Sequence, residues 1–190
     1  MKRVVVGIVG PIASGKGVVS KLFQKKGFKQ YSLSDRIREE LRKRKLPEND
    51  RLHLQNVGDE LRKKFGDGVL AERTIKKVHD DECKKIVLES IRNPGEIRLL
   101  RETLKATIIG IDASQKKRFK HLKARNRKGD PKTWKEFVKF DTREISGKRK
   151  GYQIQVDRCL QMSDFVIKNE GSKKELATKV EKVMKKFGNN

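Results

Sequence analysis

The chain has 190 residues and a mass of 22.0 kDa, enough for one well-filled hydrophobic core and too little for two independent ones. Its 49 lysines and arginines outnumber the 25 aspartates and glutamates and give a formal net charge of +24, so RNA stays open as a partner. No apolar run approaches the roughly 18 residues that cross a bilayer, so we expect a cytoplasmic protein without membrane partners. Cys83 and Cys159 lie far apart without histidines at metal-ligand spacing, so we expect neither disulfides nor zinc.

Short apolar runs alternate with amphipathic stretches, which is the pattern of parallel strands joined by helices. Strands are predicted near residues 3–9, 28–32, 84–89, 106–112 and 164–168. Helices are predicted over residues 32–45, 51–66, 67–80, 115–125, 133–145 and 171–188, and a basic hinge or loop over residues 146–152. The sequence does not indicate an oligomeric state.

These elements predict the α/β fold class, as one three-layer α/β/α domain over residues 1–190 with a five-stranded parallel sheet. The core is expected to comprise residues 1–32, 82–114 and 160–190. Two insertions, residues 33–81 and 115–150, are expected above the carboxyl ends of the strands, where ligands bind in such sheets.

The segment GPIASGK, residues 10–16, follows the first predicted strand and matches the G-x-x-x-x-G-K pattern of a phosphate-binding loop. Its glycines let successive backbone amides turn towards one anion, the next helix adds the positive end of its dipole, and Lys16 reaches the outer phosphates. We therefore predict an ATP site. Its expected binding residues are Gly10, Ala13, Ser14, Gly15, Lys16, Gly17 and Val18.

The loop lacks the hydroxyl that usually follows its lysine, because Gly17 and Val18 occupy the next two positions. Mg²⁺ keeps several waters and needs only one or two protein oxygens besides the phosphates. Glu89, at the end of the third predicted strand, is the predicted metal ligand, since a carboxylate at a neighbouring strand end lies beside such a loop.

The run SLSDRIR, residues 32–38, passes from a strand into a helix that Ser32 or Ser34 can cap. It resembles the S-x-G-D-x-x-R motif of nucleoside monophosphate kinases, with Ser34 in place of the glycine. The resemblance implies that Arg38 holds the phosphate of the acceptor. The predicted acceptor-binding residues are Ser32, Asp35, Arg38, Arg62 and Arg92.

Later segments, among them LQNVGDELRKKFGDGVLAER, IRNPGEI and SDFVIKNEGS, resemble in the same order a branch of P-loop kinases allied to dephospho-CoA kinases and deoxynucleoside monophosphate kinases. The resemblance implies a P-loop NTPase fold in which residues 33–81 form a helical acceptor-binding insertion and residues 115–150 a basic lid. It also implies that the loop with Asn169, Gly171 and Ser172 lies against the adenine of the donor.

Phosphoryl transfer needs positive charge around the moving group, and arginine forks bind its oxygens bidentately. Lid arginines therefore join the prediction, and Arg118 also counts among the donor-binding residues. The predicted catalytic residues are Lys16, Arg38, Arg92, Arg118 and Arg125, with Arg127 and Arg143 ranked below them.

The predicted function is ATP- and Mg²⁺-dependent phosphotransfer to a nucleotide-like acceptor, a nucleoside or deoxynucleoside monophosphate. Two alternatives stay open. A dephospho-CoA kinase fits the segment around Asn169, and an ATP-binding, RNA-associated factor with weak ATPase activity fits the charge of +24 and the missing loop hydroxyl.

Overall fold

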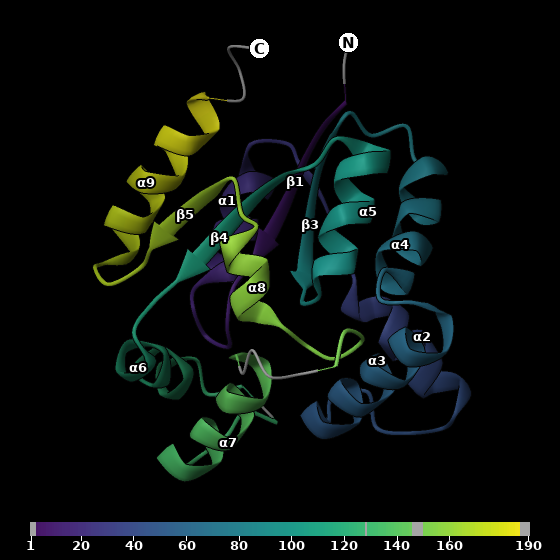
Figure 1. The fold of residues 1–190 in the computed structure, drawn as a ribbon. Coiled ribbons are helices and arrows are strands. Elements are labelled where there is room, and N and C mark those ends of the chain that lie inside the picture. The colour runs from purple at the N-terminus through teal and green to yellow at the C-terminus, as the bar shows by residue number, and fades with distance from the viewer. Residues whose placement is uncertain (1–2, 128, 146–149, 187–190) are drawn as a thin grey trace.

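A five-stranded sheet forms the centre of the protein, as seen in a computed structural model that describes residues 3–127, 129–145 and 150–186 (Figure 1). Residues 146–149 of the predicted hinge lie outside the described residues. All neighbouring strands are parallel, and the strand order is β2-β3-β1-β4-β5, which confirms the predicted sheet. The strands are β1 (Val4–Val9), β2 (Lys29–Ser32), β3 (Lys85–Ile91), β4 (Thr107–Asp112) and β5 (Phe165–Lys168).

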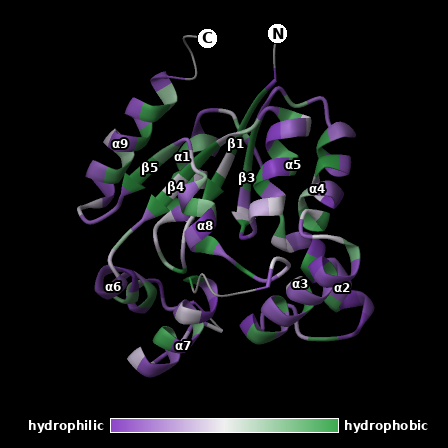
Figure 2. Cartoon of the chain, in the orientation of Figure 1, coloured by the Kyte–Doolittle hydropathy of each residue, from purple (hydrophilic) through white to green (hydrophobic). Residues whose placement is uncertain are grey.

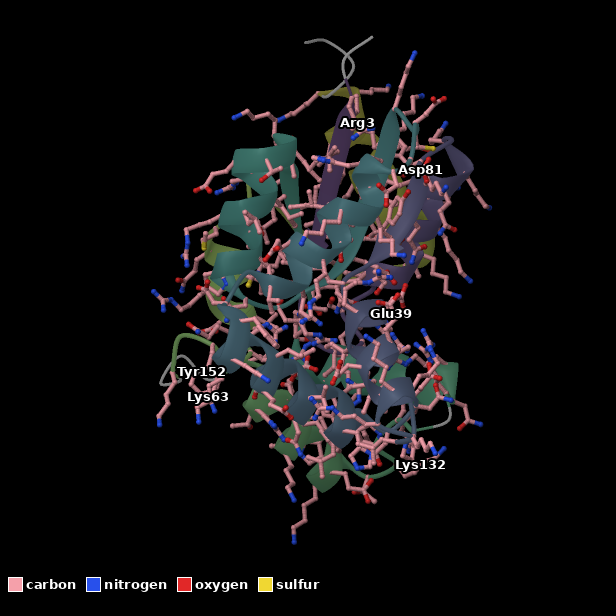
Figure 3. The ribbon with its side chains drawn as sticks, turned by 90° about the vertical axis from the view of Figure 1, so that its right-hand side faces the viewer. Arg3, Glu39, Lys63, Asp81, Lys132 and Tyr152 are labelled. Atoms are coloured by element: carbon pink, nitrogen blue, oxygen red, sulfur yellow. The ribbon has the colours of Figure 1, made fainter. Side chains whose placement is uncertain are left out.

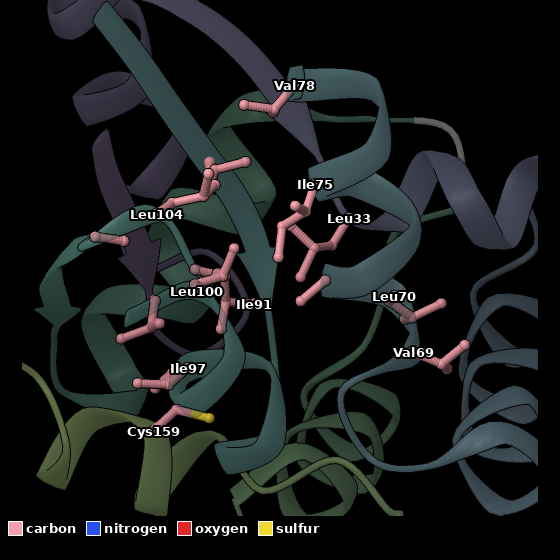
Figure 4. Close-up of a cluster of buried hydrophobic side chains, with 14 of the residues drawn as sticks. Leu33, Val69, Leu70, Ile75, Val78, Ile91, Ile97, Leu100, Leu104 and Cys159 are labelled. Carbon is pink, nitrogen blue, oxygen red and sulfur yellow. The ribbon is translucent and has the colours of Figure 1, made fainter. Parts of the chain in front are cut away.

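Helices cover both faces of the sheet, so that the fold has three layers. One face packs against α1 (Lys16–Lys25) and α9 (Lys173–Lys185). The other face packs against α4 (Val69–His79), α5 (Pro94–Leu104) and α8 (Val156–Gln161). Figure 4 shows this second cluster, in which Leu33, Ile91, Leu100 and Cys159 are buried together.

Alternating side chains explain why the strands are buried on both faces. Val5 belongs to the cluster under α4 and α5, whereas its neighbour Val6 belongs to the cluster under α1 and α9. Strands of this kind read as continuous apolar runs, and the hydrophobic colour follows them in Figure 2. The part of the chain that the structure describes contains no helix long and apolar enough to cross a membrane.

The remaining helices lie beyond the carboxyl ends of the strands (Figure 1). α2 (Ser34–Lys43) and α3 (Arg51–Phe65) come from the first insertion, and α6 (Gln115–Arg125) and α7 (Trp134–Ile145) from the second. In Figure 2 these helices are mostly hydrophilic. α4, which also belongs to the first insertion, instead joins the helical layer on the sheet.

Two helices are absent from the sequence prediction. α5 begins with a capping box formed by Asn93 and Glu96, with Pro94 in its first turn, and these are strong start signals. The segment IRNPGEI therefore contains the start signals of α5 as well as a likeness to the kinase motif. α8 spans only 6 residues and is too short for helical periodicity to reveal.

β3 carries one extra residue near its carboxyl end. Gly7 of β1 pairs with Leu88 and Val9 pairs with Ile91, so that two residues of β3 oppose one of β1. Ser90 takes up the surplus with a left-handed backbone (φ 65°). Such a bulge re-aims the side chains around it, and it lies directly beside the functional site described next.

Candidate functional site

The loop between β1 and α1 has the backbone of an anion cradle. Gly10, Ala13 and Gly15 have positive φ angles of 150°, 59° and 110°. A Cβ atom on Gly10 would lie 2.1 Å from the carbonyl oxygen of Ile111, and one on Gly15 would lie 2.5 Å from the side-chain nitrogen of Asn169. Both glycines are therefore required for this close approach, and the sequence motif and the loop geometry agree.

Lys16 extends back over this loop at the start of α1. Its Nζ donates hydrogen bonds to the carbonyl oxygens of Gly10 at 2.7 Å and Pro11 at 2.8 Å. Burial, followed by the nearby charge of Arg92, lowers its pKa to about 7. The ammonium thus lacks a fully compensating anion in this arrangement, which is the condition under which a polyphosphate binds most favourably.

Glu144, near the end of α7, supplies a buried carboxylate at this point. Its Oε2 accepts a hydrogen bond from the backbone amide of Ile12 in the loop at 3.1 Å. Its Oε1 lies 2.8 Å from Nη1 of Arg92 and 3.5 Å from Nη1 of Arg51. Burial alone would raise its pKa, but Arg92, Arg51 and Lys16 outweigh that effect and lower it. The carboxylate therefore holds an anion position between the loop and two arginines.

A cavity of about 370 Å³ lies between the two insertions, and it is lined by Glu144, which binds the loop amide of Ile12. In it Arg38 donates to Ser34 Oγ at 2.6 Å, and Ser32 Oγ lies 3.0 Å from both Ser34 Oγ and Ser90 Oγ. The cavity brings together most of the predicted acceptor residues with residues of the lid. Its charged lining residues are Asp35, Arg38, Arg51, Arg62, Glu89, Arg92, Arg127, Asp130 and Glu144.

Arg62 lines this cavity but is almost fully enclosed, with 1% of its surface exposed. Its Nε donates to Glu96 Oε1 at 2.8 Å, and Glu96 Oε2 accepts from the backbone amides of Arg92 and Asn93. The predicted acceptor ligand therefore sits in a buried ion pair. That pair also holds the turn after β3 that carries Arg92.

Arg118 does not line the cavity. It is 3% exposed and forms a two-pronged ion pair with Asp141 of α7, and it also donates to the carbonyl oxygens of Ala113 at 3.0 Å and Ile12 at 3.3 Å. The guanidinium predicted to act in catalysis is thus already engaged. It links α6, α7 and the phosphate loop, so its observed contacts position the lid.

Two other lid arginines, Arg125 and Arg143, also have protein partners. Arg125 binds Asp130 through two hydrogen bonds of 2.6 and 2.8 Å. Arg143 reaches across to Asn56 at 2.6 Å. Among the lid arginines considered from sequence, Arg127 is the one that lines the cavity in the described structure.

The segment after β5 braces the phosphate loop. The Asn169 side chain donates to the carbonyl oxygen of Ser14 at 2.8 Å. Ser172 caps α9 through a reciprocal capping box with Glu175, and a Cβ on Gly171 would lie 2.2 Å from the Glu175 carboxylate. All three predicted donor residues have a structural role here.

Glu89 lies at the carboxyl end of β3 and lines the cavity. Burial raises its pKa, and the opposing charge of Lys16 partly offsets this. The described residues contain no group of three or more His, Cys, Asp or Glu side chains that could hold a metal. Phosphates would have to supply most of the ligands of a Mg²⁺ ion at this position, and Glu89 is the carboxylate that could add a protein oxygen.

Gly17 offers no oxygen to a metal, yet space is available. A Cβ atom on Gly17 would meet no atom of the described residues within 4 Å. The absence of a hydroxyl is therefore not forced by packing.

Several site residues escaped the sequence prediction: Arg51, Gln55, Asp130, Asp141 and Glu144. A signal for the acidic ones existed. The lid segment 115–150 contains only four acidic residues among many lysines and arginines, and scarce acids in a basic segment are the natural partners of its buried arginines. No comparable pattern marks Arg51 or Gln55.

Known proteins match this chain along nearly all of its length. A family model described as an AAA domain matches residues 9–138. The UPF0200 protein PH1008 of Pyrococcus horikoshii is 36% identical, with 96% of this chain and 97% of the relative covered. A UPF0200 protein of Methanothermobacter thermautotrophicus is 30% identical, with coverages of 98% and 92%.

Solved structures share the fold at low sequence identity. Shikimate kinase from Acinetobacter baumannii, in complex with shikimate, aligns with a TM-score of 0.58 and 14% identity, covering 96% of this chain and 93% of that one. TT1252 from Thermus thermophilus aligns with a TM-score of 0.57 and 18% identity, covering 98% of each chain. The chain therefore belongs to the UPF0200 family, and its phosphate loop and five-stranded parallel sheet give it a P-loop, kinase-like fold.

Proposed function

We propose that this protein is an ATP-dependent phosphotransferase whose acceptor is a nucleoside or deoxynucleoside monophosphate. The observation that carries the proposal is the cavity of about 370 Å³, which is lined by both Arg38 and Arg92 and by Glu144, whose carboxylate binds the Ile12 amide of the phosphate loop. Its size falls in the range of small-molecule sites. The loop and Lys16 would hold the donor phosphates, and Arg38 and Arg92 the acceptor phosphate.

The reaction that this geometry supports is in-line transfer by positioning and charge. A transferring phosphoryl group gathers negative charge on its outer oxygens and needs little covalent help from the protein. Arg92 and Arg51 contact the Glu144 carboxylate, and the nearby charge of Lys16 also lowers its pKa, so this position stabilises a negative charge. Bound Mg²⁺, with Glu89 as its protein ligand, would neutralise part of the charge of the phosphates.

An ADP-release assay coupled to a chromogenic readout tests the proposal. ATP and Mg²⁺ are supplied with each nucleoside and deoxynucleoside monophosphate in turn, then with dephospho-CoA and with shikimate. We expect stimulation by one or more monophosphates. Stimulation by dephospho-CoA or shikimate alone would indicate that the acceptor is not a nucleoside monophosphate. A lack of stimulation by every acceptor would contradict the kinase proposal.

The strong positive charge favours a second candidate, an ATP-binding factor that associates with RNA. The net charge is +24, and Figure 3 shows nitrogen-tipped side chains around the outline of the molecule, Lys63 and Lys132 among them. RNA binding that is salt-sensitive and tighter than binding to unrelated DNA, without any acceptor-stimulated turnover, would support this candidate.

We predict that polyphosphate binding takes up a proton at pH 8. With a pKa of about 7, Lys16 is mostly neutral at that pH, and a bound anion favours its charged form. Titration calorimetry with ATP in buffers of different ionisation enthalpy should give an uptake close to one proton.

The Lys16→Met variant is the control and should take up no proton. Binding heats of the wild-type protein that do not depend on the buffer would contradict the prediction.

Lys16 also contributes a pH dependence to stability. Because its pKa is lowered in the folded state, the unfolded state binds more protons between about pH 7 and pH 10.5. The contribution of Lys16 to the free energy of unfolding therefore rises with pH across that window.

A further inference from the structure

Gln55 of α3 places a buried amide in the wall of the cavity. Its side chain lines the cavity and only 4% of the residue surface is exposed. Within the described residues, neither its Oε1 nor its Nε2 has a hydrogen-bond partner. Folded proteins pair nearly all buried polar groups, so an amide left unpaired at both ends in the wall of a cavity points to a partner that the protein alone does not supply.

The surroundings of Gln55 restrict the chemistry of that partner. Ile37, Leu54 and Ile154 line the same cavity and provide an apolar surface. Gln55 itself is neutral, whereas Arg38 and Arg92 already supply the positive charge for a phosphate. The unpaired amide therefore suits a neutral group that carries a hydrogen-bond donor and an acceptor side by side. The apolar lining suits a group with flat, apolar faces.

A nucleobase has this combination of properties. Every base carries adjacent hydrogen-bond donors and acceptors on its edge and an apolar face, and an amide pairs with such an edge through two hydrogen bonds. A simple sugar or a hydroxy acid lacks the flat apolar face. Arg38 and Arg92 would bind the phosphate of any phosphorylated acceptor, and the amide favours the acceptors that carry a nucleobase.

We propose that Gln55 is the residue that recognises the base of the acceptor, so that the acceptor is a nucleotide and not merely a phosphorylated sugar. The inference rests on the proposed function, because it assigns the cavity to the acceptor. It makes Gln55 a specificity-determining residue, with Arg38 and Arg92 holding the phosphate and Gln55 selecting what the phosphate is attached to.

The test is the binding of monophosphates without ATP, measured by titration calorimetry. Wild-type protein, Gln55→Met and Gln55→Glu are each titrated with the four nucleoside monophosphates and with ribose 5-phosphate, which keeps the phosphate and lacks the base. Lys63→Gln, an exposed change on the same helix, is the matched control. Thermal unfolding of each variant shows that it is folded.

We expect wild-type protein to bind its preferred monophosphate at least about tenfold more tightly than ribose 5-phosphate. Gln55→Met should remove most of that difference and leave the affinity for ribose 5-phosphate unchanged. Gln55→Glu, whose ionised side chain only accepts hydrogen bonds, should change the order of preference among the four bases. Lys63→Gln should match the wild type.

The outcomes separate this inference from the proposed function. Base-dependent binding that Gln55→Met abolishes, in a protein whose ATP turnover no acceptor stimulates, would support the role of Gln55 and contradict phosphotransfer. Monophosphate-stimulated turnover with the same base preference in wild-type protein and both variants would overturn the role of Gln55. Failure of every monophosphate to bind would also overturn it.

Discussion

Replacing Lys16 with alanine is expected to lower the turnover number with the preferred acceptor by about 10²–10³-fold, the effect of removing one preorganised donor from a charged transition state. Binding of ATP should weaken sharply, because the ammonium that reaches the outer phosphates is lost. The fold should persist. Among the described residues the Lys16 side chain bonds to two backbone carbonyl oxygens, those of Gly10 and Pro11, and burial disfavours its charged form.

The measurements are ADP release, ATP titration calorimetry and thermal unfolding. Lys21→Ala is the matched control, since Lys21 lies on the same helix and is exposed. It should keep wild-type turnover and ATP affinity. An ATP affinity that Lys16→Ala leaves intact would mean that the loop does not hold the triphosphate.

Replacing Glu144 with glutamine is expected to destabilise the protein and to tighten its binding of ATP. The change removes the charge that balances Arg92 and Arg51 and should reduce the free energy of unfolding by about 3 kcal/mol, as when one partner of a buried ion pair is removed. The same carboxylate binds the Ile12 amide of the phosphate loop. Because it competes with phosphate oxygens for these donors, the affinity for ATP should rise on the order of tenfold.

Chemical denaturation with and without ATP, together with calorimetry, measures both effects. Added ATP should recover more stability in Glu144→Gln than in wild-type protein, since ligand stabilisation grows with affinity. Glu136→Gln, on the exposed first turn of the same helix, is the control and should alter neither quantity much. Weaker ATP binding by Glu144→Gln would show that the carboxylate orders the arginines and does not compete with phosphate.

The sheet could be predicted from sequence because its signals are local. The run Val4–Val9 is apolar on both faces, as a central parallel strand requires, and the loop that follows it is recognisable from its glycines and Lys16 alone. α8 could not be predicted in the same way. Its 6 residues become helical where they pack between α5 and β4, a contact that no local pattern reveals.

The candidate site was predictable only where its residues are close in sequence. Arg38 and Ser34 lie one helical turn apart, and their contact follows from that spacing. Glu144 and the Ile12 amide, by contrast, are 132 residues apart in the sequence. Gln55 can be recognised as a site residue only from the cavity that it lines, whose lining comes from both insertions. Arg118 shows a different limit. The sequence shows that the lid contains this arginine, but it does not show that Arg118 forms an ion pair with Asp141.

Because of the bulge at Ser90, the number of residues in β3 determines which side chains at its carboxyl end face the cavity. With Ile91 returned to the hydrophobic cluster, Arg92 falls on the same side as Glu89, and both line one cavity. Deleting a single codon here would keep the neighbouring amino acids and yet turn Arg92 towards the interior. An insertion or deletion alone can therefore bring these two opposite charges to one cavity or separate them, without any substitution in the lining.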